Sequence, residues 1–292
     1  MRLYTDDYFH IGTTHLGAGM PCQDYALSRS LEDGSMSYAI VSDGCSKGGR
    51  TDVGARIVSH TAEVAIRDHW KRYSDTTADG ATKEIDLHQQ VLLTGAKVNL
   101  GLERRDLLAT CAYAFLSLQG GFVHLRGDGV MAFVYRDNTI AIWRYDWTKN
   151  MPSYPAYFED NFSAFINDQT DGIEGELIGE EWIRDKERFI PIKTTRMPAR
   201  VGVHGVTASV EERALPNLAY VALFTDGVTQ IDGIDWKDAV LSLLSFKNVA
   251  GSFAKRRMIS FIKSAQKQGK GPLDDIAYAV IRVEESEVTD DS

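Results

Sequence analysis

The chain has 292 residues, of which 43% are hydrophobic and 25% are charged, so it can bury a large core as an ordinary globular protein does. Its formal net charge of −9 argues against a nucleic-acid-binding surface, although it leaves room for a local basic patch. The sequence has no apolar run of the roughly 20 residues that a membrane helix needs, and the start, MRLYTDDYFH, lacks the apolar core of a signal peptide. The three cysteines have no CxxC spacing, which indicates neither a disulfide framework nor a zinc site. We therefore expect a single cytoplasmic domain that binds neither nucleic acid nor membrane.

The first half of the chain predicts a strand, two helices and then a run of strands. Residues 35–41 are typical of a strand, and residues 52–70 place apolar side chains on one helical face, with Asp52 as the expected N-cap. A second helix is predicted over residues 87–102. Short turns then separate four apolar runs, at 109–118, 122–127, 131–136 and 139–145. Turns this short predict an antiparallel ladder of hairpins.

The second half is less regular. Residues 148–200 are rich in Pro, Asn, Asp, Gly and aromatic side chains, and a loop-like segment of this length is usually functional or an inserted subdomain. Further on, the pattern predicts strands at 220–225 and 276–283, helices at 236–246 and 252–268, and an acidic tail at 284–292. Antiparallel strands with helices before and after them indicate an α+β fold built in layers.

Three strand-like runs end in Asp-Gly: SYAIVSDG (37–44), GFVHLRGDG (121–129) and YVALFTDG (220–227). Most of the seven Asp-Gly pairs in the chain are expected to be plain turns, because both residues tolerate tight-turn dihedrals. These three differ because an apolar strand delivers each carboxylate. Strands in one core with suitable directions would gather the following acids at one edge: Asp43, Asp128 and Asp226 at strand ends, and Asp274 and Asp275 at a strand start.

Such a group of carboxylates predicts a metal site. Clustered carboxylates repel one another and are costly to desolvate unless cations neutralise them. Mg²⁺ and Mn²⁺ prefer oxygen ligands, and a glycine at position 44 allows its backbone carbonyl to approach an ion closely. Two such ions can activate water for the hydrolysis of a phosphoester.

Six motifs occur in the order that is typical of one enzyme family: CQDYA, VSDGCSKGG, LLATCAYAFL, RGDGVMAFV, LFTDGV and LDDIAYAVI. Over residues 8–283 the chain resembles the metal-dependent type 2C protein serine/threonine phosphatases (the PPM family), and it is most similar to the bacterial branch whose first motif reads like GTTHLGAGMPCQD. The resemblance implies a central sandwich of two antiparallel β-sheets flanked by helix pairs, a four-layer αββα arrangement. It also implies a flap insertion within residues 148–200.

The resemblance also implies a role for each acid. Asp43 would bridge two Mn²⁺ or Mg²⁺ ions, and the Gly44 carbonyl would bind one of them. A bridging water would attack the phosphoester without a phospho-enzyme intermediate. The remaining metal ligands would be Asp226 and Asp274 at the first ion, Asp24 through metal-bound waters, and Asp128 at a possible third ion.

Two positions depart from the animal-type members of the family. Gly19 stands where those members have a phosphate-gripping arginine, and Cys45 stands where they have a histidine proposed to protonate the leaving group. His15, Lys47 and Arg50 are candidates to replace them, although each can equally be a solvated or structural side chain. Cys45 itself is expected to be a small packing residue, because no histidine and asparagine arrangement supports a thiol nucleophile. In the LDD motif, the first acid of the pair is the implied ligand, and Asp275 is expected to hydrogen-bond around the site.

The expected function is hydrolysis of phosphoserine and phosphothreonine in proteins, opposing a serine/threonine kinase, by a monomer. Two alternatives remain open. One is a phosphatase-like module that binds a phosphoprotein without turnover, which the retained metal ligands argue against. The other is a phosphomonoesterase for small metabolites, which the open site expected for this family argues against.

Overall fold

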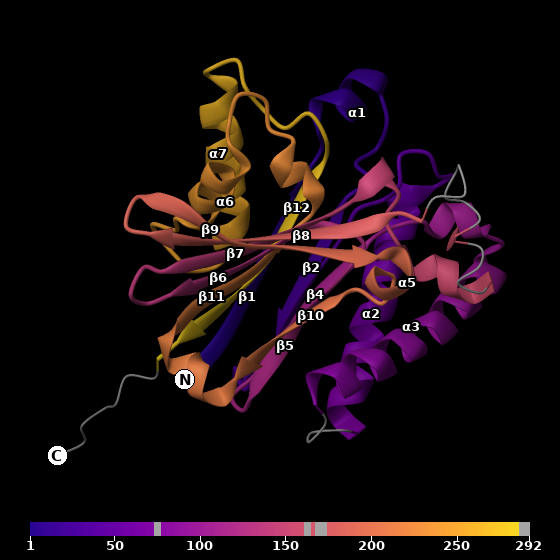
Figure 1. Ribbon diagram of the computed structural model, residues 1–292, viewed down its shortest axis with the longest axis horizontal. Coiled ribbons are helices and arrows are strands. Elements are labelled where there is room, and N and C mark those ends of the chain that lie inside the picture. Colours follow the sequence, from indigo (N-terminus) through magenta and orange to yellow (C-terminus); the bar gives the residue numbers. More distant parts are fainter. Residues whose placement is uncertain (73–76, 161–164, 167–173, 286–292) are drawn as a thin grey trace.

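Two antiparallel β-sheets pack face to face in the middle of the molecule (Figure 1). The computed structural model describes residues 1–72, 77–160, 165–166 and 174–285. In that part of the chain, the strand order of sheet A is β1 (Arg2–His10), β12 (Ile276–Glu284), β11 (Leu218–Phe224), β6 (Gly129–Tyr135), β7 (Ile140–Trp147), β8 (Glu176–Asp185), β9 (Arg188–Pro198). The order of sheet B is β10 (Val206–Glu211), β5 (Gly120–Arg126), β4 (Cys111–Ser117), β3 (Met36–Ser42), β2 (Tyr25–Ser30).

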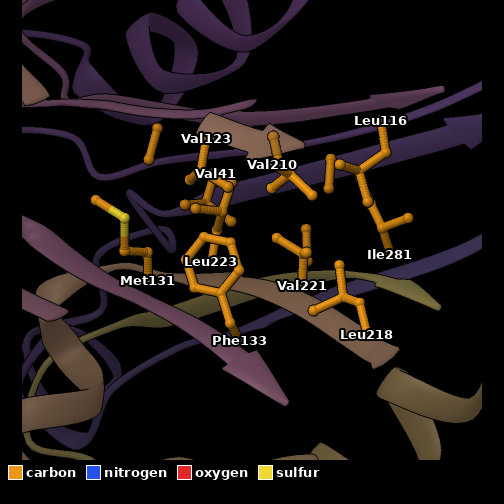
Figure 2. Packing of buried hydrophobic residues seen from close by; sticks show 14 of the residues in the cluster. Val41, Leu116, Val123, Met131, Phe133, Val210, Leu218, Val221, Leu223 and Ile281 are labelled. Carbon is orange, nitrogen blue, oxygen red and sulfur yellow. The ribbon is translucent and has the colours of Figure 1, made fainter. Parts of the chain in front are cut away.

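The main core lies between the two sheets. Figure 2 shows Val41 and Val123 of sheet B close to Leu223 of sheet A, and all three side chains are buried. Strands β3, β4 and β12 are nearly buried on both faces, because helices cover the sides that face away from the sandwich. The sequences of strands buried on both faces are continuous apolar runs, without alternation of apolar and polar residues.

Helix pairs form the two outer layers. Helices α2 (Thr51–Arg72) and α3 (Ala78–Leu100) cover sheet B, where Val58 and Ile85 belong to one buried cluster with Tyr113. Helices α6 (Trp236–Leu244) and α7 (Phe253–Gln266) cover sheet A, where Val240 and Met258 belong to one buried cluster with strands β11 and β12. The predicted α+β class and its four-layer αββα arrangement are confirmed (Figure 1).

Shorter helices connect these elements: α1 (Thr13–Ala18), α5 (Ala199–Gly202), and the 3₁₀ helices η1 (Arg104–Leu107), η2 (Thr148–Asn150), η3 (Pro155–Asp160), η4 (Glu212–Asn217) and η5 (Asp226–Thr229). Among the helices of the described ranges, none has the length and apolarity needed to span a bilayer.

Several sequence predictions were wrong in detail. Residues 176–198 of the segment expected to be irregular form β8 and β9, which extend sheet A from β7. The sequence did not predict β9 because this edge strand is exposed along most of its length and therefore lacks alternating apolar and polar residues. Asp52 lies in the first turn of α2 and is not its N-cap, since the helix begins at Thr51. Helix α3 begins at Ala78, nine residues before the predicted start.

Strands β1, β2 and β10 were not predicted, since each is short or carries many polar residues. Of the predicted acidic tail, Glu284 ends β12, and residues 286–292 lie outside the described residues. Part of the predicted flap, residues 161–164 and 167–173, also lies outside them.

Candidate active site

Strand ends from both sheets meet at one end of the sandwich. In sheet B, Tyr25 of β2 pairs with Ser42 of β3, so Asp24 and Asp43 lie beside each other just beyond that pair. In sheet A, Phe224 at the end of β11 pairs with the starts of β6 and β12. That register brings three further acids to the same end: Asp128 before β6, Asp226 after β11 and Asp274 before β12.

The acids surround a cavity of about 140 Å³. Asp43 and Gly44 line it from sheet B, and Asp128, Asp226 and Asp274 line it from sheet A. The other lining residues are His15, Cys45, Ser46, Lys47, Asn150, Pro152, Tyr154 and Gln230. Asp24 is fully buried behind the cavity and shares a side-chain hydrogen bond with Asp43.

The carboxylates disfavour one another's charge. Burial raises the pKa of Asp43 well above its usual value, and the neighbouring charges of Asp24, Asp226 and Asp128 raise it further. Burial also raises the pKa of Asp24 and of Asp128. At Asp226, burial and then the charge of Asp274 raise the pKa to about 6. A bound cation would lower these pKa values again, because it favours the ionised form of every acid around it.

The donor set fits a hard divalent cation. Asp128 Oδ1 is buried and accepts no hydrogen bond from any described residue, although a buried carboxylate oxygen normally has a partner. The lining acids offer oxygen ligands, with the Gly44 carbonyl as a neutral one, and Mg²⁺ and Mn²⁺ prefer such ligands.

Hydroxyl and amide groups orient the carboxylates. The Thr225 hydroxyl donates to Asp24 Oδ2 over 2.6 Å. Gln230 Nε2 donates to Asp226 Oδ2 at 2.9 Å and to Asp274 Oδ2 at 3.3 Å, so one amide links two acids from different strands. Asp274 Oδ1 also accepts a hydrogen bond from the Asp275 backbone amide at 2.8 Å, so both oxygens of Asp274 are held in place.

Asp275 ties the N-terminal segment to β12. Its Oδ1 accepts a hydrogen bond from the Gly12 backbone amide at 2.7 Å. Its Oδ2 accepts hydrogen bonds from the Gln23 backbone amide at 2.6 Å and from Nδ1 of His15 at 2.9 Å. His15, Asp274 and Asp275 each have a potential ligand atom within 4.8 Å of the others. However, the hydrogen bonds occupy both oxygens of Asp275 and Nδ1 of His15, so this trio fits a structural network better than an ion site. As predicted, Asp275 hydrogen-bonds around the site.

Two of the glycines that follow the acids are required by close packing. A Cβ on Gly44 would lie 2.6 Å from the Thr51 carbonyl oxygen, and a Cβ on Gly227 would lie 1.7 Å from that of Asp275. Neither position can therefore accept a side chain without a shift of backbone.

The candidates for phosphate contacts separate into two groups. His15 and Lys47 line the cavity. Arg50 is exposed and does not line the cavity, so the structure does not place it there; its backbone amide donates to Asp106 Oδ1 at 3.0 Å. Gly19 ends α1 in the left-handed conformation and has open space around it. Cys45 packs against the cluster around Trp147, in keeping with a packing role, while also lining the cavity.

Sequence reasoning missed three residues at the site. Gln230 lies four residues after Asp226, a spacing that could have indicated a contact across one helical turn. Thr110 accepts the Asp43 amide at 2.9 Å and belongs to the LLATCAYAFL motif. Tyr154 lines the cavity from the segment before η3, and burial followed by the charges of Cys45 and Asp43 raises the pKa of its hydroxyl. No pattern near Tyr154 distinguishes it from its aromatic neighbours.

Comparisons with known proteins agree with this fold. A family model described as protein phosphatase 2C matches residues 11–151. The search of curated proteins found no match. The serine/threonine phosphatase Stp1 from Staphylococcus aureus is 10% identical, with a TM-score of 0.54 over 98% of this chain and 96% of that one. A bacterial serine phosphatase is 11% identical, with a TM-score of 0.54 over 98% of this chain and 100% of that one.

A Caenorhabditis elegans sex determining protein is 15% identical, with a TM-score of 0.55 over 97% of this chain and 65% of that one. At these identities the likeness is one of fold. The resemblance that the six motifs indicated is confirmed by the family match and by this fold.

Proposed function

The chain is a relative of the protein phosphatase 2C family, and on that premise we propose that it hydrolyses phosphoserine and phosphothreonine in proteins with Mn²⁺ or Mg²⁺. One observation carries the proposal. Acids from strand ends of two sheets converge on one cavity, where burial and the charges of their neighbours raise the pKa values of Asp43, Asp128 and Asp226. The nearby charge of Arg144 lowers the pKa values of Asp128 and Asp226 but does not cancel the rise.

We assign the metal ligands as follows. Asp43 and the Gly44 carbonyl would hold ions from sheet B, and Asp226 and Asp274 would complete the first site. Asp128 would serve a possible third ion through its free oxygen, and Asp24 would hold coordinated water. When bound, the ions would lower the pKa of a water for attack on phosphorus and neutralise the phosphoryl oxygens.

The remaining polar residues bind and orient. Gln230 holds Asp226 and Asp274 beside the cavity by donating to one oxygen of each. Lys47 places a positive charge at the cavity wall, where it can contact a phosphoryl oxygen. Asp275 fixes the ring of His15 at that wall by accepting its Nδ1–H. The Tyr154 hydroxyl keeps its proton because its pKa is raised, so it remains a hydrogen-bond donor.

The substrate would be a phosphorylated protein, and the physiological partner a serine/threonine kinase that adds the phosphate. The cavity supports this choice over a small metabolite, since it is small and polar and has few apolar walls to enclose a ligand.

A comparison of two substrates tests the proposal. Phosphate release from a phosphothreonine peptide and from p-nitrophenyl phosphate should be measured with Mn²⁺ and with EDTA. We expect Mn²⁺-dependent turnover of both, with the higher kcat/KM on the peptide. Peptide binding without any turnover would indicate the binding module. Turnover of small phosphoesters alone would indicate the metabolite phosphatase.

A further inference from the structure

The segment before the last metal-site acid has an unusual charge. Residues 239–273 contain seven basic side chains and no acidic one, whereas the rest of the chain holds 25 basic and 41 acidic side chains. This local excess stands out in a protein of net charge −9. Helix α7 and the turn after it carry six of the seven.

Four of these cations form what we call the basic stripe: Arg256, Lys263, Lys267 and Lys270. The first three follow the spacing i, i+7, i+11, so they lie along one face of α7. That face is exposed, whereas Met258 and Phe261 on the opposite face are buried against sheet A.

Within the described residues, no salt bridge neutralises the charges of the stripe, although the Asp6 carboxylate interacts electrostatically with Arg256. Lys237 on the neighbouring helix α6 pairs with Asp235 at 3.1 Å, but Lys263 and Lys267 form no ion pair within the described part of the chain. The Arg256 guanidinium donates to the carbonyls of Asn248 and Ala250, and Lys270 Nζ donates to the Gly233 carbonyl at 2.8 Å. Carbonyl partners fix these side chains and leave their charge in place.

The last residue of the basic stripe lies close in sequence to a residue of the active site. Lys270 and Asp274 are four positions apart in the sequence, so their Cα atoms lie within about 14 Å of each other. The connecting segment also packs on α1, since the amides of Thr13 and Thr14 donate to the carbonyls of Pro272 and Leu273, each at 3.0 Å. Figure 1 shows this gold segment passing next to α1 before it enters β12.

We propose that the basic stripe binds an acidic segment of the phosphoprotein substrate, a few residues away from the phosphorylated side chain. The inference rests on the proposed function and adds a substrate class to it. Complementary charge supports it, because acidic segments are repelled by the rest of this surface and attracted here. The position supports it too, since a bound chain could reach from the stripe to the cavity along α1.

The test compares two phosphothreonine peptides that differ only in a distal tract, acidic in one and Ser/Gln in the other. With Mn²⁺ at low ionic strength, we expect kcat/KM for the acidic peptide to be about tenfold higher, as for electrostatically steered binding. Added salt should reduce the ratio. Lys263→Glu combined with Lys267→Glu should bring the ratio to about one or below.

The matched control reverses two exposed cations on other elements, Lys83→Glu and Arg213→Glu, and should keep the wild-type ratio. A ratio near one in the wild type, or an equal loss in both double variants, would overturn the inference while leaving phosphatase activity in place. Failure to hydrolyse either peptide would contradict the proposed function and this inference with it. Binding of anionic vesicles or duplex DNA that depends on the two lysines, without peptide selectivity, would assign the stripe to another partner.

Discussion

Individual aspartates at strand ends have different roles, although their local sequences look alike. Asp33-Gly34 is a plain turn in which Asp33 Oδ1 accepts the Ser35 amide at 2.9 Å, and Gly34 has a positive φ. Asp43-Gly44 follows a buried strand instead and faces a cavity shared with acids from the other sheet. The sequence distinguishes the two cases only by what precedes the pair, a polar loop or an apolar strand.

We expect Asp43→Asn to lower turnover by at least ~10²-fold, the scale of losing one electrostatic catalytic group. The metal-free fold should not lose stability, because the change removes one charge from a mutually repelling cluster. Phosphate release and thermal unfolding of the same samples would measure both effects. Asp33→Asn is the matched control, with turnover close to that of the wild type. Equal turnover in the two variants would exclude Asp43 from the chemistry.

The acid cluster also predicts a dependence of stability on pH. The folded-state pKa of Asp226 is raised to about 6, so folding favours its protonated form. Its contribution to the free energy of unfolding is therefore fully present below about pH 4 and is lost as pH rises through about 6. Asp226→Asn removes this contribution and should make the metal-free protein relatively more stable as pH rises from 4 to 6. Urea unfolding at several pH values would measure the difference, and a difference that does not change with pH would contradict the assignment.

The two neighbouring acids at the start of β12 should respond differently to the same change. Asp274→Asn is expected to cost at least ~2–3 kcal/mol of transition-state stabilisation. Asp275→Asn should keep most activity, because Asp275 is expected to hydrogen-bond around the site and not to coordinate an ion. The structure adds a stability cost of ~1–3 kcal/mol, since an amide nitrogen would face a backbone N–H that now donates to a carboxylate oxygen. Kinetics across a Mn²⁺ titration and melting curves would separate the two effects. If Asp275→Asn were fully stable but inactive, Asp275 and not Asp274 would be the metal ligand.

At the scale of elements, the hairpin of β8 and β9 was the least predictable part. Strand β8 pairs with β7 along its length, and Leu177 at its start is fully buried in a cluster with Trp147, Tyr154 and Val203. That cluster supports the wall of the cavity to which Tyr154 belongs. The sequence contains these apolar residues, but their partners are distant along the chain and their spacing has no period. We propose that this region influences substrate choice more than chemistry.

Leu177→Ala tests this element. We expect it to lower the free energy of unfolding by ~2–5 kcal/mol, as for other buried leucines. It should also lower kcat/KM on a phosphopeptide more than on p-nitrophenyl phosphate, because it loosens a wall and leaves the acids in place. Ile190→Ala is the control, since Ile190 on β9 is 44% exposed and such changes usually cost less than ~0.5 kcal/mol. Equal losses on both substrates would mean that the wall supports the chemistry itself.

For the whole molecule, the layered fold was predictable because the hydrophobic pattern within each strand and helix indicates which of its faces are buried. Buried strands such as Met36–Ser42 and Ile276–Glu284 are apolar on both faces, and the helices beside them have one apolar face. The acids of the site were predictable as strand termini. Their partners were not, since the contacts from Gln230 to Asp274 and from His15 to Asp275 join residues 44 and 260 positions apart. Only the assembled sheets reveal such pairs.

The central claim is that these acids bind the divalent cations that phosphoester hydrolysis requires. The most direct measurement is a calorimetric Mn²⁺ titration of the EDTA-treated protein, run beside phosphate release from a phosphothreonine peptide over the same Mn²⁺ concentrations. We predict that binding and activity rise together, in the millimolar range or below as expected for water-rich coordination, and that both are lost in Asp43→Asn. Full activity without added metal, or unchanged Mn²⁺ binding in Asp43→Asn, would contradict the claim.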